Sequence, residues 1–247
     1  MKWGIAMENK VLEAGIGKWE DRRDLKNLMG RYMYSLLYYR HANLLSQFWS
    51  ERDDICLGFN NGYYKGREAI EEYYRACHDW TVFQGKLMQK YFPETLGEKT
   101  EEELFGVGPL ELKPMSMPVI AIAEDGETAK GMWYSRGSYA KITKSGPTAY
   151  WTWGVFCVDF VREGGEWKIW HMLNVEDINH IAGQNWAAPE EPFADEPGFE
   201  EAEEFSLPEP NVPQINRSLY TPDRPFTRLP ELPVAYRTFA ETFSYGI

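Results

Sequence analysis

The stretch MPVIAIAEDGETAKGMWY (117–134) decides the fold, because two runs of β-forming residues flank a polar Asp-Gly turn. A turn of this kind between apolar runs predicts a β-hairpin. Two further runs follow, separated by Gly-containing turns of the same sort. The expected strands are 117–123, 130–142, 149–162 and 167–175. This part of the chain is therefore predicted to be an antiparallel meander.

Ahead of the meander, the apolar residues recur with a helical period. Residues 19–40 place apolar side chains every three or four positions, which predicts a helix. A second short helix is expected from Leu44, a strand at 54–59, and a third helix opening at Gly66. Residues 93–114 are polar and rich in Gly and Pro, which favours an excursion or lid. Helices first and antiparallel strands second indicate an α+β domain, not a parallel α/β sheet.

The end of the chain has a different composition. Ten of the fifteen prolines lie from Pro189 onward, and residues 187–216 carry nine acids without a Lys or Arg. This predicts an extended acidic linker that builds no core of its own. Apolar residues return after it, at Leu229, Leu232, Tyr236, Phe239, Phe243 and Tyr245. We expect an N-terminal segment at 1–18, a domain at 19–182, and a tail at 183–247 that docks on its own domain or on a neighbouring subunit.

Composition excludes several classes of function. The formal net charge is −12, and a basic footprint for nucleic acid is missing. The three cysteines are far apart and form no Cys-x-x-Cys or Cys/His cluster, so we expect neither a metal nor a disulfide framework. There is no signal-peptide pattern and no run of 18 apolar residues, so the sequence predicts a cytoplasmic protein without membrane spans.

Four stretches resemble the nuclear-transport-factor-2-like superfamily, and specifically its SnoaL-like branch. DLKNLMGRYMYSLLYYRHANLLSQFWSERDDICLGF (24–59) is similar to that branch's opening helix pair and first strand. GYYKGREAIEEYYRA (62–76) is similar to its third helix. MPVIAIAEDGETAKGMWY and GGEWKIWHM (164–172) are similar to its hairpins. The resemblance covers about 19–182, and the four stretches occur in the family's order.

The resemblance implies a cone-shaped curved antiparallel sheet packed on the N-terminal helices, with one deep pocket along the concave face of the sheet. It also implies a homodimer or homotrimer. Relatives include ketosteroid isomerase, scytalone dehydratase, polyketide cyclases and a lyase of lignin-derived dimers, which perform acid–base chemistry without a metal or other cofactor. Tyr38 stands where scytalone dehydratase carries an acid, and Lys113 stands where many relatives carry a His. Those two roles therefore do not carry over to this chain.

Four residues are candidate catalytic groups on the basis of their chemistry. Tyr38 could donate a hydrogen bond, Arg136 could hold a phenolate or carboxylate, and His171 is a natural base near neutral pH. Lys113 could act as base or donor if burial lowers its pKa. Each also has a structural interpretation: a rim tyrosine, an exposed arginine, a core histidine or a solvated lysine. His41, at the expected helix break, is a weaker candidate.

A second group of residues could bind an aromatic substrate by stacking or hydrogen bonding. This group comprises Tyr34, Phe59, Trp80, Trp133, Trp151, Trp153 and Asn174. Alternation places Trp151 and Trp153 on one face of their strand. Some of these rings could instead pack on helices or on a partner subunit.

Two functions remain open from the sequence. The first is a cofactor-independent lyase, dehydratase or isomerase that acts on a small aromatic or polycyclic compound, such as a phenolic, lignin-dimer-like or polyketide-like molecule. The second is a non-catalytic module of the same fold that binds a hydrophobic ligand or dimerises. Convergence of two or more of Tyr38, Arg136, His171, Lys113 and Asn174 in the cavity would favour the enzyme. A cavity plugged by the C-terminal rings would favour the module.

Overall fold

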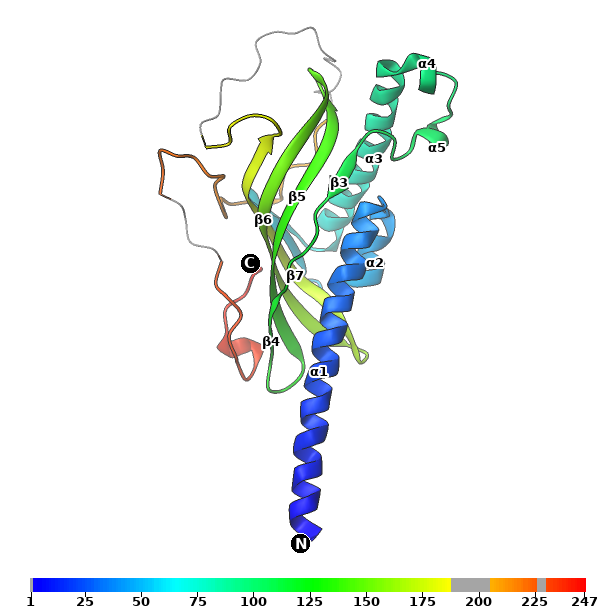
Figure 1. The fold of residues 1–247 in the computed structure, drawn as a ribbon. Coiled ribbons are helices and arrows are strands. Elements are labelled where there is room, and N and C mark those ends of the chain that lie inside the picture. The colour runs from blue at the N-terminus through cyan, green and yellow to red at the C-terminus, as the bar shows by residue number, and fades with distance from the viewer. Residues whose placement is uncertain (1, 188–204, 226–229) are drawn as a thin grey trace.

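The computed structural model describes residues 2–187, 205–225 and 230–247, with side chains from residue 15 onward (Figure 1). The helices lie on one face of a curved sheet, and the C-terminal segment lies on the opposite face. The predicted α+β class is confirmed. Most of the expected acidic linker, at 188–204, and Leu229 are outside the described residues.

Three helices form most of the helical layer. They are α1 (Lys2–Leu37), α2 (Leu44–Phe48) and α3 (Arg67–Tyr91). A 3-10 turn (His41–Asn43) precedes α2, and the short helices α4 (Pro93–Leu96) and α5 (Glu101–Leu104) follow α3. The expected start of the first helix is wrong: the helix begins at Lys2, since no proline interrupts residues 2–18. Within the described residues, no helix is long and apolar enough to cross a bilayer.

Eight strands form one sheet in the order β3-β5-β6-β7-β1-β2-β8, and β4 also pairs with β5. The strands are β1 (Cys56–Phe59), β2 (Gly62–Lys65), β3 (Leu110–Leu112), β4 (Val119–Ile122), β5 (Thr128–Thr143), β6 (Gly146–Glu163), β7 (Glu166–Ile181) and β8 (Val212–Pro213). The predicted meander corresponds to β4–β7, and all the named strand pairs are antiparallel except β1 with β7. The expected excursion contains the additional strand β3.

Two irregularities in β7 decide which side chains face the helices. The register with β6 shifts twice, and Trp170 and Asp177 are left without a partner residue. An extra residue of this kind is a β-bulge, and it reverses the alternation of faces beyond it. Ile169 therefore packs in the core on the helix side, whereas His171 lies on the outer face.

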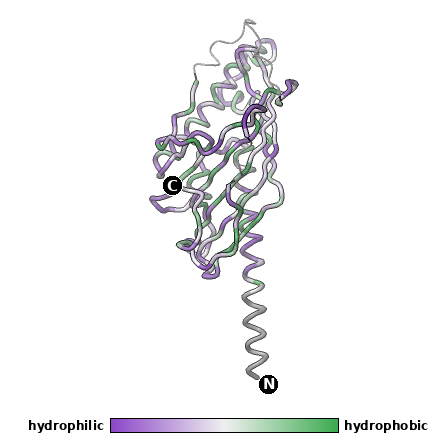
Figure 2. The backbone as a smooth tube through the Cα atoms, turned by 90° about the vertical axis from the view of Figure 1, so that its left-hand side faces the viewer, coloured by the Kyte–Doolittle hydropathy of each residue, from purple (hydrophilic) through white to green (hydrophobic). Residues whose placement is uncertain are grey.

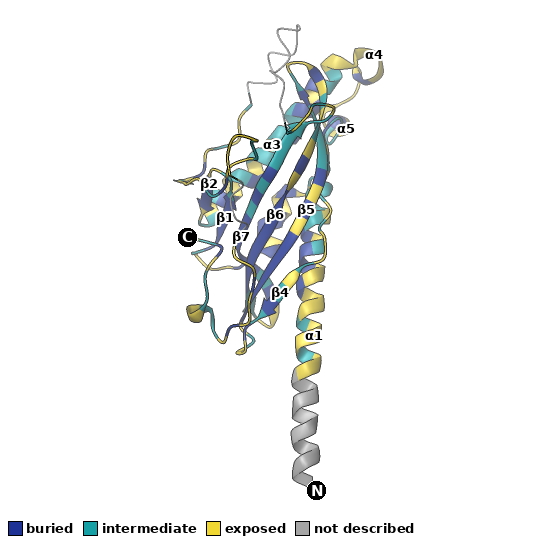
Figure 3. Ribbon diagram, turned by 60° about the vertical axis from the view of Figure 1, so that its left-hand side comes forward, coloured by how far each residue is buried: buried dark blue, intermediate teal, exposed yellow. Residues whose placement is uncertain are grey.

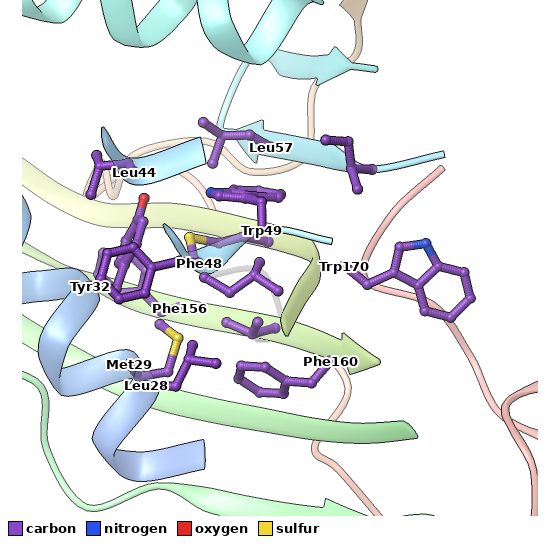
Figure 4. Packing of buried hydrophobic residues seen from close by; sticks show 14 of the residues in the cluster. Leu28, Met29, Tyr32, Leu44, Phe48, Trp49, Leu57, Phe156, Phe160 and Trp170 are labelled. Carbon is purple, nitrogen blue, oxygen red and sulfur yellow. The ribbon is translucent and has the colours of Figure 1, made fainter. Parts of the chain in front are cut away.

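The main core lies between the helices and the inner face of the sheet (Figure 4). Leu28 and Met29 of α1 pack there beside Trp49, Phe156 and Phe160. Trp49 and Phe160 are almost completely buried, and each such ring contributes about 1.5–3 kcal/mol through burial. Figure 2 shows hydrophobic positions gathered in the strands, with hydrophilic residues at the turns.

The outer face of the sheet is partly covered by the C-terminal segment, residues 230–247, which packs on its own domain. Tyr236 and Tyr245 are buried, and Tyr245 packs in a second cluster with Cys56 and Val155. The backbone N–H of Tyr245 donates to Asp159 Oδ2 at 2.8 Å. Leu232, which was expected to dock, is 54% exposed. Figure 3 shows the buried strands of the sheet and the exposed positions in the middle of α1.

Candidate functional site

A cavity of about 430 Å³ opens on the inner side of the sheet. Its walls come from α3, β3, β5, β7 and the β1–β2 turn. The lining residues are Tyr39, Phe59, Asn60, Asn61, Trp80, Pro109, Leu110, Glu111, Lys113, Tyr139, Ala140, Asn174, Glu176, Asn179 and Leu219. Three predicted binding residues, Phe59, Trp80 and Asn174, are among them. The cavity therefore combines aromatic walls with a set of polar groups.

Lys113 lies between two carboxylates in this cavity. Its Nζ is 3.1 Å from Glu111 Oε1 and 3.2 Å from Glu176 Oε1, and the lysine side chain is only 17% exposed. Burial lowers the pKa of Lys113, but the two carboxylates outweigh burial and raise that pKa above its ordinary value. The expectation of a lowered pKa is therefore wrong. Lys113 is a protonated donor rather than a base.

Glu176 is held by neutral donors as well as by the lysine. Thr152 Oγ1 donates to its Oε1 at 2.6 Å, and Asn179 Nδ2 donates to its Oε2 at 2.7 Å. The hydroxyl of Tyr139 donates to Asn179 Oδ1 at 2.7 Å, and its ring stacks on Tyr150 with centroids 4.6 Å apart. Burial raises the pKa of Tyr139 above its ordinary value, so this hydroxyl stays protonated. The result is a connected chain of hydrogen bonds from β5 to the cavity carboxylate.

The tyrosine of this site is Tyr39, one position after the predicted Tyr38. Helix α1 ends at Leu37, and Tyr39 has a left-handed φ of 54°. Its hydroxyl donates to the carbonyl of Pro109 at 2.6 Å, and burial raises its pKa to about 12. Tyr38 is 61% exposed, so its predicted place in the cavity is wrong. The expected helix ended at residue 40, three positions beyond its observed end, and the turn after Leu37 places Tyr39 rather than Tyr38 at the cavity.

A second groove of about 730 Å³ runs between α1 and residues 111–118. Tyr34 and Trp133 line this groove and not the first cavity, although Trp133 is also largely buried in the core. Glu111 and Lys113 line both spaces. The two openings therefore meet at the charged cluster.

Arg136, Trp151 and Trp153 do not reach the inner cavity, which corrects their predicted role. The Arg136 guanidinium lies 5.4 Å from the centre of the Trp153 ring. Both border a different space of about 1080 Å³ with Tyr134, on the outer face. Trp151, two residues before Trp153 on β6, lies on the same face of the strand and is 49% exposed. Alternation was predicted correctly for the two tryptophans, but the side assigned to them was wrong.

His171 is also outside the inner cavity. The bulge at Trp170 turns its side chain to the outer face, where Nδ1 lies 2.9 Å from Asp159 Oδ2 and 3.1 Å from Ser244 Oγ. The tail covers it there, and Lys130 donates to the other oxygen of Asp159 at 2.6 Å. The predicted catalytic histidine is therefore part of the docking contact of the C-terminal segment.

His41 lies near the site but is not among the residues that line it. It is 6% exposed, and its Nδ1 has no hydrogen-bond partner among the described residues. Burial lowers its pKa to about 4, so the imidazole is neutral near pH 7. In the described residues, no group of three or more His, Cys, Asp or Glu side chains is placed to hold a metal ion.

The comparisons with known proteins fit this architecture. Residues 18–173 match the model of the SnoaL-like domain family, and the chain belongs to that family. Its curved sheet packed on helices is the nuclear-transport-factor-2-like fold that the sequence predicted. No curated protein matches the chain.

Several solved structures are similar to this chain. A protein from Kribbella flavida is 13% identical, with a TM-score of 0.48, over 66% of this chain and 95% of its own. A candidate scytalone dehydratase from Novosphingobium aromaticivorans DSM 12444 is 14% identical, with a TM-score of 0.46, over 71% and 97%. A type 2 hexachlorocyclohexane dehydrochlorinase (LinA) is 12% identical, with a TM-score of 0.45, over 72% and 99%. At these identities the likeness concerns the fold alone.

Proposed function

We propose that this protein is a cofactor-independent lyase, dehydratase or isomerase that performs acid–base chemistry on a small aromatic or polycyclic substrate. One observation supports this most directly. A protonated lysine, Lys113, lies between the carboxylates of Glu111 and Glu176 inside an aromatic-walled cavity. Charged groups of both signs in a confined space are what proton transfer next to a carbonyl or phenol requires.

Each member of the cluster has a role in the proposal. A lysine ammonium has three N–H donors, and the two carboxylates engage two of them. The third donates to a carbonyl or phenolic oxygen of the substrate and stabilises the negative charge that develops there. The carboxylate of Glu111 pairs with Lys113. It takes the proton from the substrate and later returns it to the product or leaving group. Glu176 orients the lysine.

The shape of the cavity supports an aromatic substrate. About 430 Å³ lies within the range for small-molecule sites and suits a molecule of one to three fused or linked rings. Phe59, Trp80 and Tyr139 offer ring faces and edges against which such a molecule can stack. Asn174 and Tyr39 add polar groups at the wall. A phenolic, lignin-dimer-like or polyketide-like compound fits this description.

The alternative is a module that binds a ligand without chemistry. Two of the five polar residues that would favour an enzyme, Lys113 and Asn174, line the same cavity. The C-terminal rings that could have plugged the cavity, such as Tyr245, instead pack on the outer face. Both observations favour the enzyme over the binding module.

We also propose that the protein forms a homodimer or homotrimer through its outer sheet face. Tyr134, Trp151 and Trp153 are 42%, 49% and 42% exposed on that face, beside the part that the C-terminal segment covers. Exposed rings gathered in one area are typical of an interaction surface. A second copy of the chain would remove them from water.

The test of the proposed function is a panel of phenolic, steroidal and polyketide-like compounds, assayed first by thermal shift and then by turnover. A bound compound raises the unfolding temperature because it stabilises the native state. We expect at least one binder to be converted without added metal or cofactor, and we expect Lys113→Met to abolish that conversion. Binding without any conversion across the panel would support the binding module instead.

A further inference from the structure

The segment 211–220 lies beyond the matched family region, yet it forms part of the cavity wall. Its strand β8 pairs with β2, and the backbone N–H of Asn216 donates to the carbonyl of Asn60 at 2.8 Å. The side chain of Leu219 lines the cavity itself. Residues 211–220 therefore form part of the mouth of the cavity.

The same segment holds the bulged residue of β7. Arg217 donates through Nε to Oδ1 of Asp177, and the two side chains are only 2% and 9% exposed. The backbone N–H of Tyr220 donates to the carbonyl of Asp177 at 2.7 Å. Asp177 is the extra residue that brings Glu176 and Asn179 to the same face of the sheet. Residues 217–220 therefore bind both the side chain and the backbone of Asp177.

A second link runs through Asn60. Its Nδ2 donates to the carbonyl of Glu176 at 2.8 Å, and its Oδ1 accepts from the backbone N–H of Glu176 at 2.8 Å. The carbonyl of Asn60 is held in turn by Asn216. Asn60 therefore fixes the backbone of Glu176, and Arg217 fixes the next residue, Asp177.

We propose that Arg217 is a positioning residue, which fixes the Asp177 bulge and so aligns Glu176 with Asn179 and Lys113. The inference rests on the proposed function, in which Glu176 orients the lysine. Without Arg217 the Asp177 carboxylate is buried without its cation, an arrangement that proteins avoid by local rearrangement. Movement of the bulge would separate Glu176 from Asn179 and leave Lys113 misaligned, while the aromatic walls of the cavity stay in place.

Binding of 2-naphthol and of naphthalene, followed by fluorescence, separates these two effects. Both molecules use the ring walls, but only 2-naphthol accepts a hydrogen bond from Lys113. We expect Arg217→Met to weaken 2-naphthol binding at least fivefold and to leave naphthalene binding unchanged. Arg217→Lys keeps the charge and should restore part of the loss. Lys130→Met is the matched control, because it also removes a buried cation paired with an aspartate and should change neither affinity.

Several outcomes would overturn the inference. These are an equal loss for both compounds in Arg217→Met, no loss for either, or no binding of either by the unaltered protein. If Arg217→Met does not fold, Arg217→Lys decides the matter, and unaltered 2-naphthol affinity in that variant contradicts the proposal. Turnover of the panel compounds is measured separately from these binding experiments. If no panel compound is converted, the proposed function fails, while the 2-naphthol comparison still decides the role of Arg217.

Discussion

Asn179 donates a hydrogen bond from Nδ2 to Oε2 of Glu176 at 2.7 Å, although three positions separate the two residues on β7. In a regular strand, side chains at an odd separation point to opposite faces of the sheet. The extra residue Asp177 removes this conflict, because it shifts the register with β6. Asn179 therefore reaches Glu176 in the cavity only because the strand is irregular at this point.

Glu176→Gln keeps the shape of the side chain and removes its charge. We expect conversion of the best panel substrate to fall by about 10²-fold or more, because Lys113 loses one of its two carboxylate partners. Steady-state kinetics measure this. Glu166→Gln on the same strand is the control, since that carboxylate is 76% exposed. Full activity of Glu176→Gln would show that the Glu176 carboxylate has no role in the reaction.

The raised pKa of Lys113 predicts how its contribution depends on pH. A lysine whose pKa is higher in the folded state contributes stability that is fully present below the unfolded value of about 10.4. That contribution is lost as the pH rises through the folded value. The difference in unfolding free energy between the wild type and Lys113→Met should thus be constant from about pH 7 to about pH 9. Denaturant titrations that show the difference shrinking across this range would contradict the assignment.

His41 predicts an acid-sensitive loss of stability. Its pKa is about 4 when folded, against an ordinary value of 6.5, so below pH 6.5 the unfolded chain takes up a proton that the folded protein does not. This costs about 3 kcal/mol of unfolding free energy between pH 6.5 and pH 4. His41→Gln should reduce that dependence in denaturant titrations, whereas His180→Gln, on a partly exposed histidine, should not. Equal slopes in wild type and His41→Gln would refute the prediction.

Tyr245 predicts how strongly the C-terminal segment is docked. Its side chain is 3% exposed, and its hydroxyl donates to the carbonyl of Glu231 at 2.5 Å. Tyr245→Ala should lower the unfolding free energy by about 3–5 kcal/mol, the usual cost of removing a buried ring. Leu232→Ala, at a residue 54% exposed, should change it by less than about 0.5 kcal/mol. Chemical denaturation of the two variants compares them directly.

The outer face predicts a change in assembly. Replacing Trp151 and Trp153 by Asp introduces two charges among exposed rings and should dissociate a homodimer or homotrimer that uses this face. Sedimentation velocity of the wild type and the double variant measures the mass. A monomeric wild type, or an unchanged mass in the double variant, would show that this face is not the subunit contact.

The sequence predicted the regular parts of the fold well. The apolar periodicity and the Asp-Gly and Gly-Gly turns located the strands β5 and β6, and the starts of α3 and β7, to within a few residues. Such signals are local, so a single sequence carries them. The start of α1 was missed because residues 2–18 have no apolar periodicity strong enough to predict a helix. In the structure they continue the helix that packs from Leu25 onward, and no proline interrupts it.

The candidate site was predicted less well, and the reasons are structural. His171 was proposed as a base on its chemistry, and alternation placed it on the face of Ile169, but the bulge at Trp170 reversed its face. Glu176 was missed because the last strand was expected to end at Val175, whereas β7 continues to Ile181. Bulges and strand ends depend on pairing with neighbouring strands. No local sequence pattern predicts the bulge at Trp170 or the end of β7. Lys113 lines the cavity, but its pKa depends on Glu111 and Glu176, whose proximity to it is set by the tertiary structure.

The link between Arg217 and Asp177 bears on how this pocket could be moved or redesigned. The match to the SnoaL-like family ends at residue 173, but residues that line the cavity continue to Leu219. A transplant of the domain alone onto another SnoaL-like scaffold would leave behind Glu176, Asn179 and the segment that aligns them. Any graft, chimaera or library built on this pocket should therefore keep residues 174–181 and 211–220 together with it.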